Sequence, residues 1–431
     1  MSLYLLLQRR QQRKERAQRS PGRRVGQAGL AAGVLVALIA SVLLLLGGLL
    51  YTDLVHDLPS LAQLPALFDY PQGSFYQPTR LYERGGMQVI YALENPGAPR
   101  DYLSINIAMQ RHFPPYLVEV ILDVVQPAIW QSPGLDWGQL TSGEARTIAE
   151  QMASDWLLWQ EEAGLRRALR MRLLAGQVVS YYGREQILEW YLNSAYFGHL
   201  AYGAESAARL YFGKSAQDVT LSEAIALAAV LQAPALNPLD APAAAVQRQR
   251  ELMERLFAQG VISEEEYLQA REEPLQFAAA PSEPDSPARA YSQLVLEQLY
   301  SRYGRERVER GGLEVTTTLD LDLQRQLACS AQAQLARMRA QTGAMEDCPA
   351  ALRLPALPPG LPVYPDGLTA SATMLDPRSG EVLAYLGDTS VEGESRLAQA
   401  RPPGSTLTPF IALAAFARTS SPSSLVWDIP S

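Results

Sequence analysis

The 431-residue sequence predicts an N-terminal transmembrane helix, a mainly α-helical domain and then the start of an α+β domain. Three patterns support this prediction. Residues 25–52 carry no charge, the apolar residues from Leu117 to about Arg271 recur at helical spacing, and residues 371–388 read as two strands around a tight turn. A composition that is 48% hydrophobic and 19% charged is typical of globular domains.

The first 52 residues have the pattern of an uncleaved signal anchor. Residues 1–24 hold eight Lys or Arg and one Glu, which is a net charge of +7. Because the whole chain has a net charge of −8, the remaining residues carry a net charge of −15. The uncharged run 25–52 exceeds the roughly 20 residues that span a bilayer core, and it lacks the small-residue end of a cleaved signal peptide. Because basic flanks stay inside, we expect a cytoplasmic tail, a single pass through the cytoplasmic membrane and an extracytoplasmic bulk.

Residues 53–76 are predicted to be a linker, and residues 77–273 a helical domain that opens with a hairpin around Gly85 and Gly86. Capping boxes predict the starts of two helices in this domain, at Thr220 to Glu223 and at Ser263 to Glu266. Prolines then flank a linker region, residues 274–365, which contains a strand within 313–319 and a helix that runs to about Arg339. Residues 366–431 form the last domain.

The cysteines and histidines predict no metal site. Cys329 and Cys348 are the only cysteines, and they either pair outside the cytoplasm or leave Cys329 as a buried thiol in a helix. The three histidines, His56, His112 and His199, are scattered along the chain.

The segment from Arg184 to Leu239 contains "REQILEWYLN", followed by "YFG", "AYG" and "YFGK". It resembles the peptidoglycan glycosyltransferase domain (glycosyltransferase family 51) of class A penicillin-binding proteins, whose motif is K-x-x-I-L-x-x-Y-L-N. The resemblance extends from "PTRLYERGG" at Pro78 through "GGLEVTTTLDLDLQ" into the first part of a transpeptidase domain. It implies a lysozyme-like domain that polymerises lipid-linked disaccharide and a truncated transpeptidase-like domain that would cross-link stem peptides.

The catalytic carboxylates of that family are replaced here. Counting back from Gly134 in the motif E-D-x-x-F-x-x-H-x-G puts Val125 at the general base and Gln126 at the following Asp. Asp123 lies about 200° around a helix from Val125, so we expect it to be a solvated surface carboxylate. In the motif R-K-x-x-E, Met171 stands at the second Glu, where helical spacing favours a core methionine.

A further family motif, G-x-S-T-x-T-Q-Q, corresponds to "EARTIAEQ". Glu150 stands at one of its glutamines and is the most credible substitute carboxylate, although a charged residue on an exposed helix face needs no function. The resemblance implies substrate-binding roles for the residues that survive or remain cationic: Thr147, Gln151, Arg167, Arg170, Arg184, Asn193 and Arg248. Arg166, Arg167, Arg170 and Arg172 would hold a phosphate or face water or lipid headgroups.

A turn that ends at Gly404 places Ser405 where the transpeptidase motif S-x-x-K has its nucleophile, but Thr408 replaces the lysine base. Thr408 is instead expected to cap a helix that runs through Ala417, with Pro409 at its first position. The later S-x-N and K-T-G motifs are not reached before Ser431.

These observations favour a membrane-anchored pseudoenzyme that binds lipid-linked precursor, glycan or an envelope partner such as a cell-wall or division protein. Nucleic acid is not an expected partner. One alternative is an active, divergent glycosyltransferase that uses Glu150 or Asp123 and requires a divalent cation, Mg or Mn. Another is a truncated bifunctional penicillin-binding protein.

Overall fold

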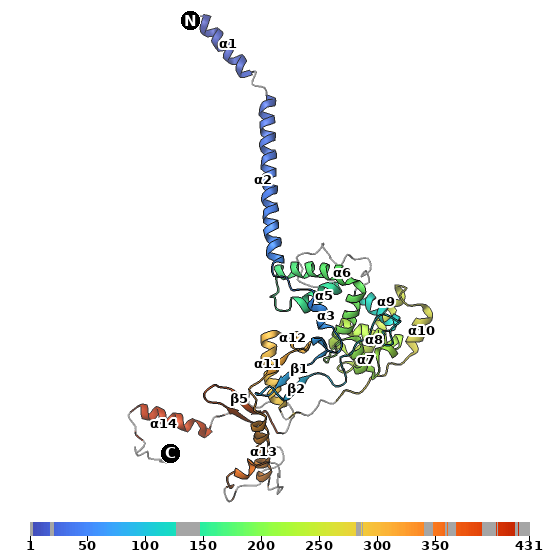
Figure 1. Cartoon of the computed structure of the whole chain (residues 1–431), viewed down its shortest axis with the longest axis vertical. Coiled ribbons are helices and arrows are strands. Elements are labelled where there is room, and N and C mark those ends of the chain that lie inside the picture. The colour runs from blue at the N-terminus through green and yellow to red at the C-terminus, as the bar shows by residue number, and fades with distance from the viewer. Residues whose placement is uncertain are drawn as a thin grey trace, which may run out of the picture. The chain divides into compact units, whose positions relative to one another are not determined.

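The computed structural model describes residues 3–17, 21–125, 147–281, 286, 288–339, 348–357, 360, 368–389, 402, 404–418 and 421 (Figure 1). They form two compact units. The first unit comprises the residues up to Tyr70 together with Arg100–Ala279, and the second comprises Pro71–Pro99 together with the described residues from Ala280 onward. This division differs from the predicted single domain 77–273, because the hairpin that opens that range belongs to the second unit.

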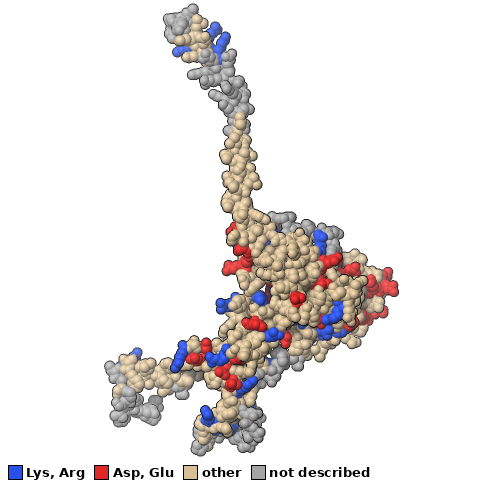
Figure 2. Space-filling model, viewed as in Figure 1, with Lys and Arg blue, Asp and Glu red and all other residues tan. Residues whose placement is uncertain are grey.

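Two helices precede the packed part of the first unit: α1 (Leu3–Ala17) and α2 (Pro21–Val55). Within α2, Ala32–Val55 contains an 18-residue window with a mean hydropathy of 2.7, and none of that window is buried. Among the described residues it is the one helix long and apolar enough to cross a membrane. Figure 2 shows α2 without charge along its apolar length, and acidic side chains appear where it meets the first unit.

The segment after α2 packs into the first unit and is not the linker that the sequence predicts. It contains the short helix α3 (Gln63–Leu67), and Leu64 and Phe68 are buried. The ring of Phe68 stacks on Trp190 at 5.4 Å and meets the edge of Trp156 at 5.1 Å, measured between centroids. Apolar residues at helical spacing in this segment therefore fill part of the core of the unit.

The remaining elements of the first unit are helical, as predicted for Leu117 to Arg271. Helix α8 is buried along nearly its whole length, and α4, α7, α9 and α10 pack around it. The elements are α4 (Pro115–Val125), α5 (Ile148–Met152), the π-helical turn η3 (Ala153–Leu157), α6 (Leu165–Ser194), α7 (Ala204–Phe212), the turn η4 (Ala216–Asp218), α8 (Leu221–Gln232), the turn η5 (Pro234–Leu236), α9 (Pro242–Ala258) and α10 (Glu264–Glu272).

Helix α6 consists of two helical parts joined at Gly183, whose backbone has φ 79° and ψ 166°. This left-handed φ favours glycine because a Cβ would clash with the backbone. The first part carries four arginines, and the second carries the "REQILEWYLN" segment. The break at Gly183 therefore separates the four arginines from the "REQILEWYLN" segment, although the two follow each other in the sequence.

Both predicted capping boxes are present. At the start of α8, the Thr220 hydroxyl accepts a hydrogen bond from the Glu223 amide, and the Glu223 carboxylate accepts one from the Thr220 amide. The Ser263 and Glu266 pair does the same at the start of α10. Each box satisfies two backbone N–H groups that a helix start leaves without partners.

Replacing Thr220 by alanine is expected to lower the free energy of unfolding by about 1 kcal/mol, because the first turn of the buried helix α8 loses its cap. Thr220→Ser keeps a hydroxyl in place and serves as the matched control. Denaturant unfolding of both variants measures the difference, and equal losses for serine and alanine would contradict a capping role.

The second unit contains two small sheets with helices. Strand β1 (Thr79–Tyr82) pairs antiparallel with β2 (Val89–Leu93), which confirms the predicted hairpin, and parallel with β3 (Glu314–Thr316). The other sheet is the predicted hairpin of β4 (Ala372–Leu375) and β5 (Val382–Leu386). The helices are α11 (Arg289–Tyr303), α12 (Arg305–Glu309) and α13 (Leu321–Met338), and short turns lie at Ser74–Tyr76 and Ala351–Arg353.

Helix α13 is held on β5 by Gln324, whose side chain accepts from the Tyr385 amide at 2.8 Å and donates to the Tyr385 carbonyl at 3.1 Å. Cys329 on α13 forms a disulfide with Cys348, with the Cα atoms 5.9 Å apart. The structure thus decides between the two alternatives for the cysteines in favour of the pair.

The last described helix, α14 (Thr408–Ala417), follows directly from the turn Gly404–Leu407. The N-cap is Leu407, not Thr408 as predicted, because the preceding turn already gives Leu407 a helical backbone and makes Thr408 the first helical residue. The side chain of Ser405 lies outside the described residues.

Candidate functional site

Val125, which the motif spacing predicts at the position of the family's general base, lies at the end of α4. Val125 is the last residue of this helix and is partly buried, and its aliphatic side chain cannot accept a proton. Gln126 lies outside the described residues. Asp123, two residues earlier on α4, is partly buried, so it is less solvated than the sequence predicts.

Glu150 is buried, with 1% of its surface exposed. The expectation that it lies on an exposed helix face is therefore wrong. It is the third residue of α5 and forms a capping box with Thr147: the Glu150 amide donates to Thr147 Oγ1 at 3.1 Å, and the Thr147 amide donates to Glu150 Oε2 at 3.2 Å. Its other oxygen, Oε1, lies 3.7 Å from Arg172 Nε. Both carboxylate oxygens and the Thr147 hydroxyl therefore have internal partners.

Met171, at the position of the family's second carboxylate, is 2% exposed, which confirms the prediction of a core residue. Ala168, one turn earlier on α6, is also buried. Helix α6 packs against α5. Apolar packing thus occupies the position where the family has a charged group.

The arginines of α6 mostly serve the interior of the first unit, contrary to the expectation that they face water or lipid. Arg170 is 1% exposed, and Arg172 is buried beside Glu150. Arg167 donates to the Ser154 hydroxyl at 3.0 Å and to the Leu158 carbonyl at 3.3 Å. It thereby ties α6 to η3 and the residue that follows it. Of these four arginines, Arg166 is the exposed one.

The remaining predicted binding residues lie on three helices. Gln151 is exposed on α5, Arg184 is partly exposed just after the break in α6, and Arg248 is partly exposed on α9. All three are accessible in part, unlike Thr147 and Arg170. Arg167 on α6 is also partly exposed.

Asn193 is 1% exposed and acts as a scaffold residue. Its side-chain oxygen accepts from the Leu103 amide at 3.0 Å, and its nitrogen donates to the carbonyls of Leu103 and Glu189, each at 2.8 Å. Its own carbonyl oxygen would lie 2.5 Å from a Cβ at Gly203, whose φ is 90°. The asparagine of "YLN" and the glycine of "AYG" are thus explained by close backbone packing rather than by substrate contact.

Glu189, also in the "REQILEWYLN" segment, is a residue whose role the sequence reasoning missed. Its carboxylate accepts hydrogen bonds from the Tyr102 hydroxyl, from Ser104 Oγ at 2.6 Å and from the Ile105 amide at 2.8 Å. Burial raises the pKa of Tyr102, and the hydrogen bond to Glu189 raises it further. Glu189 and Asn193 are four residues apart, and together they fix residues 102–105 against α6.

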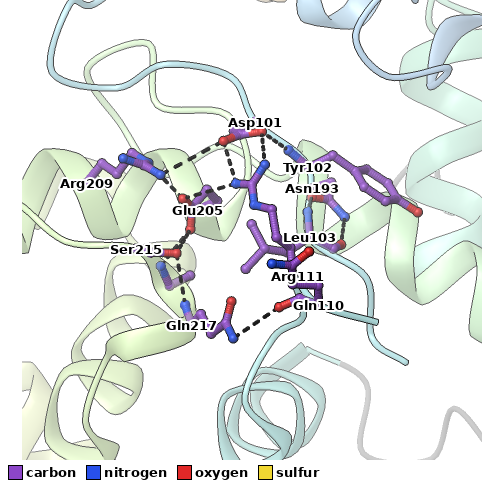
Figure 3. Close-up of polar contacts among 11 residues, drawn as sticks. Asp101, Tyr102, Leu103, Gln110, Arg111, Asn193, Glu205, Arg209, Ser215 and Gln217 are labelled. Carbon is purple, nitrogen blue, oxygen red and sulfur yellow. Dashed lines mark hydrogen bonds and ion pairs between the residues drawn. The ribbon is translucent and has the colours of Figure 1, made fainter. Parts of the chain in front are cut away.

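A second missed cluster surrounds Glu205, in the first turn of α7, which is fully buried (Figure 3). Its carboxylate accepts from Arg209 Nε at 2.7 Å, from Ser215 Oγ at 2.8 Å and from the Ala216 amide at 2.6 Å. Arg111 lies 3.8 Å from the same carboxylate. The signal in the sequence was the Glu205 and Arg209 pair, four residues apart on one helix face.

Arg111 links this cluster to Asp101, to which it donates two hydrogen bonds (Figure 3). Burial raises the pKa of Asp101, but hydrogen bonds from Arg111 and Tyr70 lower it by more, so the pKa lies below its ordinary value. The hydrogen bonds to Asp101 raise the pKa of Arg111. The cluster therefore holds the segment 101–111 on α7 by internal ion pairs.

Within the described residues, no group of three or more His, Cys, Asp or Glu side chains is arranged to hold a metal ion. His199 Nε2 lies 2.9 Å from the Asp240 carboxylate.

Comparisons with known proteins find relatives for part of the chain. Residues 118–257 match the family model described as Transglycosylase. Penicillin-binding protein 1A of Aquifex aeolicus is 35% identical over 189 residues, 44% of this chain and 25% of that protein. Penicillin-binding protein 1A of Neisseria lactamica is 30% identical over 292 residues, 64% of this chain and 35% of that protein.

A crystal structure of penicillin-binding protein 1A from Haemophilus influenzae aligns with a TM-score of 0.33 and 22% identity, over 63% of this chain and 31% of that one. The chain spans between 25% and 35% of the length of the two relatives above. It carries a transglycosylase domain related to that of the class A penicillin-binding proteins.

Proposed function

We propose that this chain is a membrane-anchored member of the peptidoglycan glycosyltransferase family that binds lipid-linked precursor without polymerising it. The observation that carries the proposal is the loss of both catalytic carboxylates. Val125 stands at the general base and Met171 at the second carboxylate, and Met171 is packed in the core.

Glu150, the predicted replacement carboxylate, does not offer an open site for catalysis. Glu150 accepts the Thr147 amide through one oxygen and faces Arg172 with the other, and it is 1% exposed. A general base must lie within hydrogen-bond reach of the acceptor hydroxyl. Since losing such a base typically lowers a rate by about 10² to 10⁴-fold, the two replacements together support inactivity.

Peptide cross-linking is not expected either. The family's lysine is replaced by Thr408, whose exposed side chain lies at the first position of α14. A threonine hydroxyl is neither basic nor cationic near neutral pH, so it cannot activate a neighbouring serine. The proposal therefore assigns no transpeptidase activity to these residues.

The proposed site of action is the outer face of the cytoplasmic membrane. The apolar window Ala32–Val55 is long enough to span the bilayer, and the basic residues before it favour a cytoplasmic N-terminus. Gln151, Arg184 and Arg248 are predicted binding residues that remain at least partly accessible, and the two arginines supply positive charge for a lipid pyrophosphate.

The test is polymer formation by detergent-purified, full-length protein that is given lipid-linked disaccharide peptide and either Mg²⁺ or Mn²⁺. We expect no glycan polymer, together with saturable binding of the same lipid in a parallel assay. Polymer would overturn the proposal, and the variants Glu150→Gln and Asp123→Asn would then show which carboxylate is the base.

A further inference from the structure

Charged side chains connect the end of the apolar helix to α6. Asp57 lies two residues beyond the end of α2, and its Oδ1 accepts hydrogen bonds from two guanidinium groups: from Arg166 Nη2 at 3.1 Å and from Arg170 Nη1. Arg170 also donates to the main-chain carbonyl of Asp57 at 2.8 Å. Arg166 reaches one turn back along α2, where its Nη2 donates to the Asp53 carbonyl at 3.2 Å.

Arg170 and Asp57 differ strongly in burial. The side chain of Arg170 is 1% exposed, whereas that of Asp57 is 56% exposed. A buried guanidinium is stable only with anionic partners, and Arg170 has a second one, Glu161, whose Oε1 lies 3.0 Å from its Nε. The hydrogen bond from Arg170 lowers the pKa of Asp57, and the charge of Arg166 adds to this effect.

Two guanidinium groups that converge on one oxygen are an arrangement that also suits a phosphate. An anion in place of the Asp57 carboxylate would meet both arginines from the solvent side, since Asp57 is the exposed partner. If α2 spans the membrane as proposed, Asp57 lies at the level of the lipid headgroups. The chemistry of a ligand here is therefore that of a phosphate group at the membrane surface.

We propose that Asp57 fills an anion site on α6, formed by Arg166 and Arg170, and so clasps the segment after the anchor while keeping phosphate groups off these arginines. This proposal, which we call the Asp57 clasp, depends on the proposed function in one respect only, the position of α2 in the membrane. Tyr182 supports the same segment further along, because its hydroxyl donates to the Leu61 carbonyl at 2.8 Å.

Replacing Asp57 by asparagine tests the clasp in the full-length protein. The change keeps the shape of the side chain, and Arg170 keeps Glu161, so we expect the variant to fold. Inorganic pyrophosphate is expected to bind Asp57→Asn about tenfold more tightly than the parent, because an internal charge-assisted competitor is removed. Amides of residues 57–61 are expected to exchange hydrogen faster.

Asp53→Asn is the matched control, because its carboxylate is exposed and lies 3.6 Å from Arg166. It should strengthen pyrophosphate binding by less than Asp57→Asn does, because Asp53 lies farther from Arg166 than Asp57 does, and it should leave hydrogen exchange at residues 57–61 unchanged. Adding Arg166→Gln to Asp57→Asn should remove the gained affinity. Vesicles with and without phosphatidylglycerol show whether a lipid phosphate competes for the same site.

Equal pyrophosphate binding by the parent and by Asp57→Asn, with unchanged exchange, would overturn the clasp. So would a gain of binding that survives the loss of Arg166. These measurements need no turnover, so they fail or succeed independently of the polymer assay that tests the proposed function.

Discussion

Replacing Glu205 by alanine is expected to lower the free energy of unfolding by about 3 kcal/mol, one of the two largest effects that we predict. The carboxylate is fully buried and accepts hydrogen bonds from Arg209, Ser215 and the Ala216 amide. Without it, a buried backbone N–H and a hydroxyl lose their acceptor. Arg111 and Arg209 are partly exposed and can bind water instead. The loss of stability is therefore expected to lie at the lower end of the range for breaking a buried ion pair.

Chemical denaturation of Glu205→Ala measures this effect, and Glu254→Ala provides the control. Glu254 is exposed on α9, so its removal should change stability by less than about 0.5 kcal/mol. Because Arg111 couples the cluster to Asp101, hydrogen exchange should also rise across residues 101–111 in Glu205→Ala. A loss below about 1 kcal/mol would mean that the cluster does not hold the segment.

Features that depend on neighbouring residues could be predicted from the sequence. The hairpins at residues 79–93 and 372–386 follow from short alternating patterns around turn residues. The capping boxes at Thr220 and Ser263 follow from four-residue spacings, and the core position of Met171 follows from helical periodicity. Each of these signals lies within a few residues of the feature that it predicts.

Features that depend on distant residues could not be predicted. Strand β1 pairs with β3, more than 200 residues later in the chain, and this moves the first hairpin into the second unit. Glu150 looks like a surface carboxylate until Arg172 is placed beside it. Asn193 looks like a binding residue until its amide meets Leu103.

The surroundings of the α6 arginines also depend on distant residues and could not be predicted from the sequence. Their number on one helix predicts a basic surface, but the sequence does not show that Asp57 and Glu161 neutralise Arg170. A motif search likewise treats Glu189 as a variable position, although its carboxylate binds three groups of residues 102–105. The family motif therefore predicts the fold of this region better than it predicts which residues meet a ligand.

Replacing Met171 by glutamate, which restores the family's second carboxylate, is expected to destabilise the protein by about 3 kcal/mol or more and to yield no polymerase activity. Met171 is 2% exposed on α6, so the new carboxylate would be buried. Activity would still lack a base, because Val125 is unchanged. Met171→Leu, which conserves volume, should cost less than about 1.5 kcal/mol.

The pH dependence of stability separates the charge from the change of shape. Burial raises the pKa of a carboxyl group above its ordinary value of about 4.3, so the introduced group binds its proton more tightly in the folded state than in the unfolded state. The cost of Met171→Glu relative to Met171→Gln should therefore be smallest below about pH 4 and grow as the pH rises through the raised pKa. Unfolding curves for both variants at several pH values measure this difference. A cost independent of pH would show that the introduced carboxylate reaches water, and polymer formation by Met171→Glu would show that position 171 still faces a working cleft.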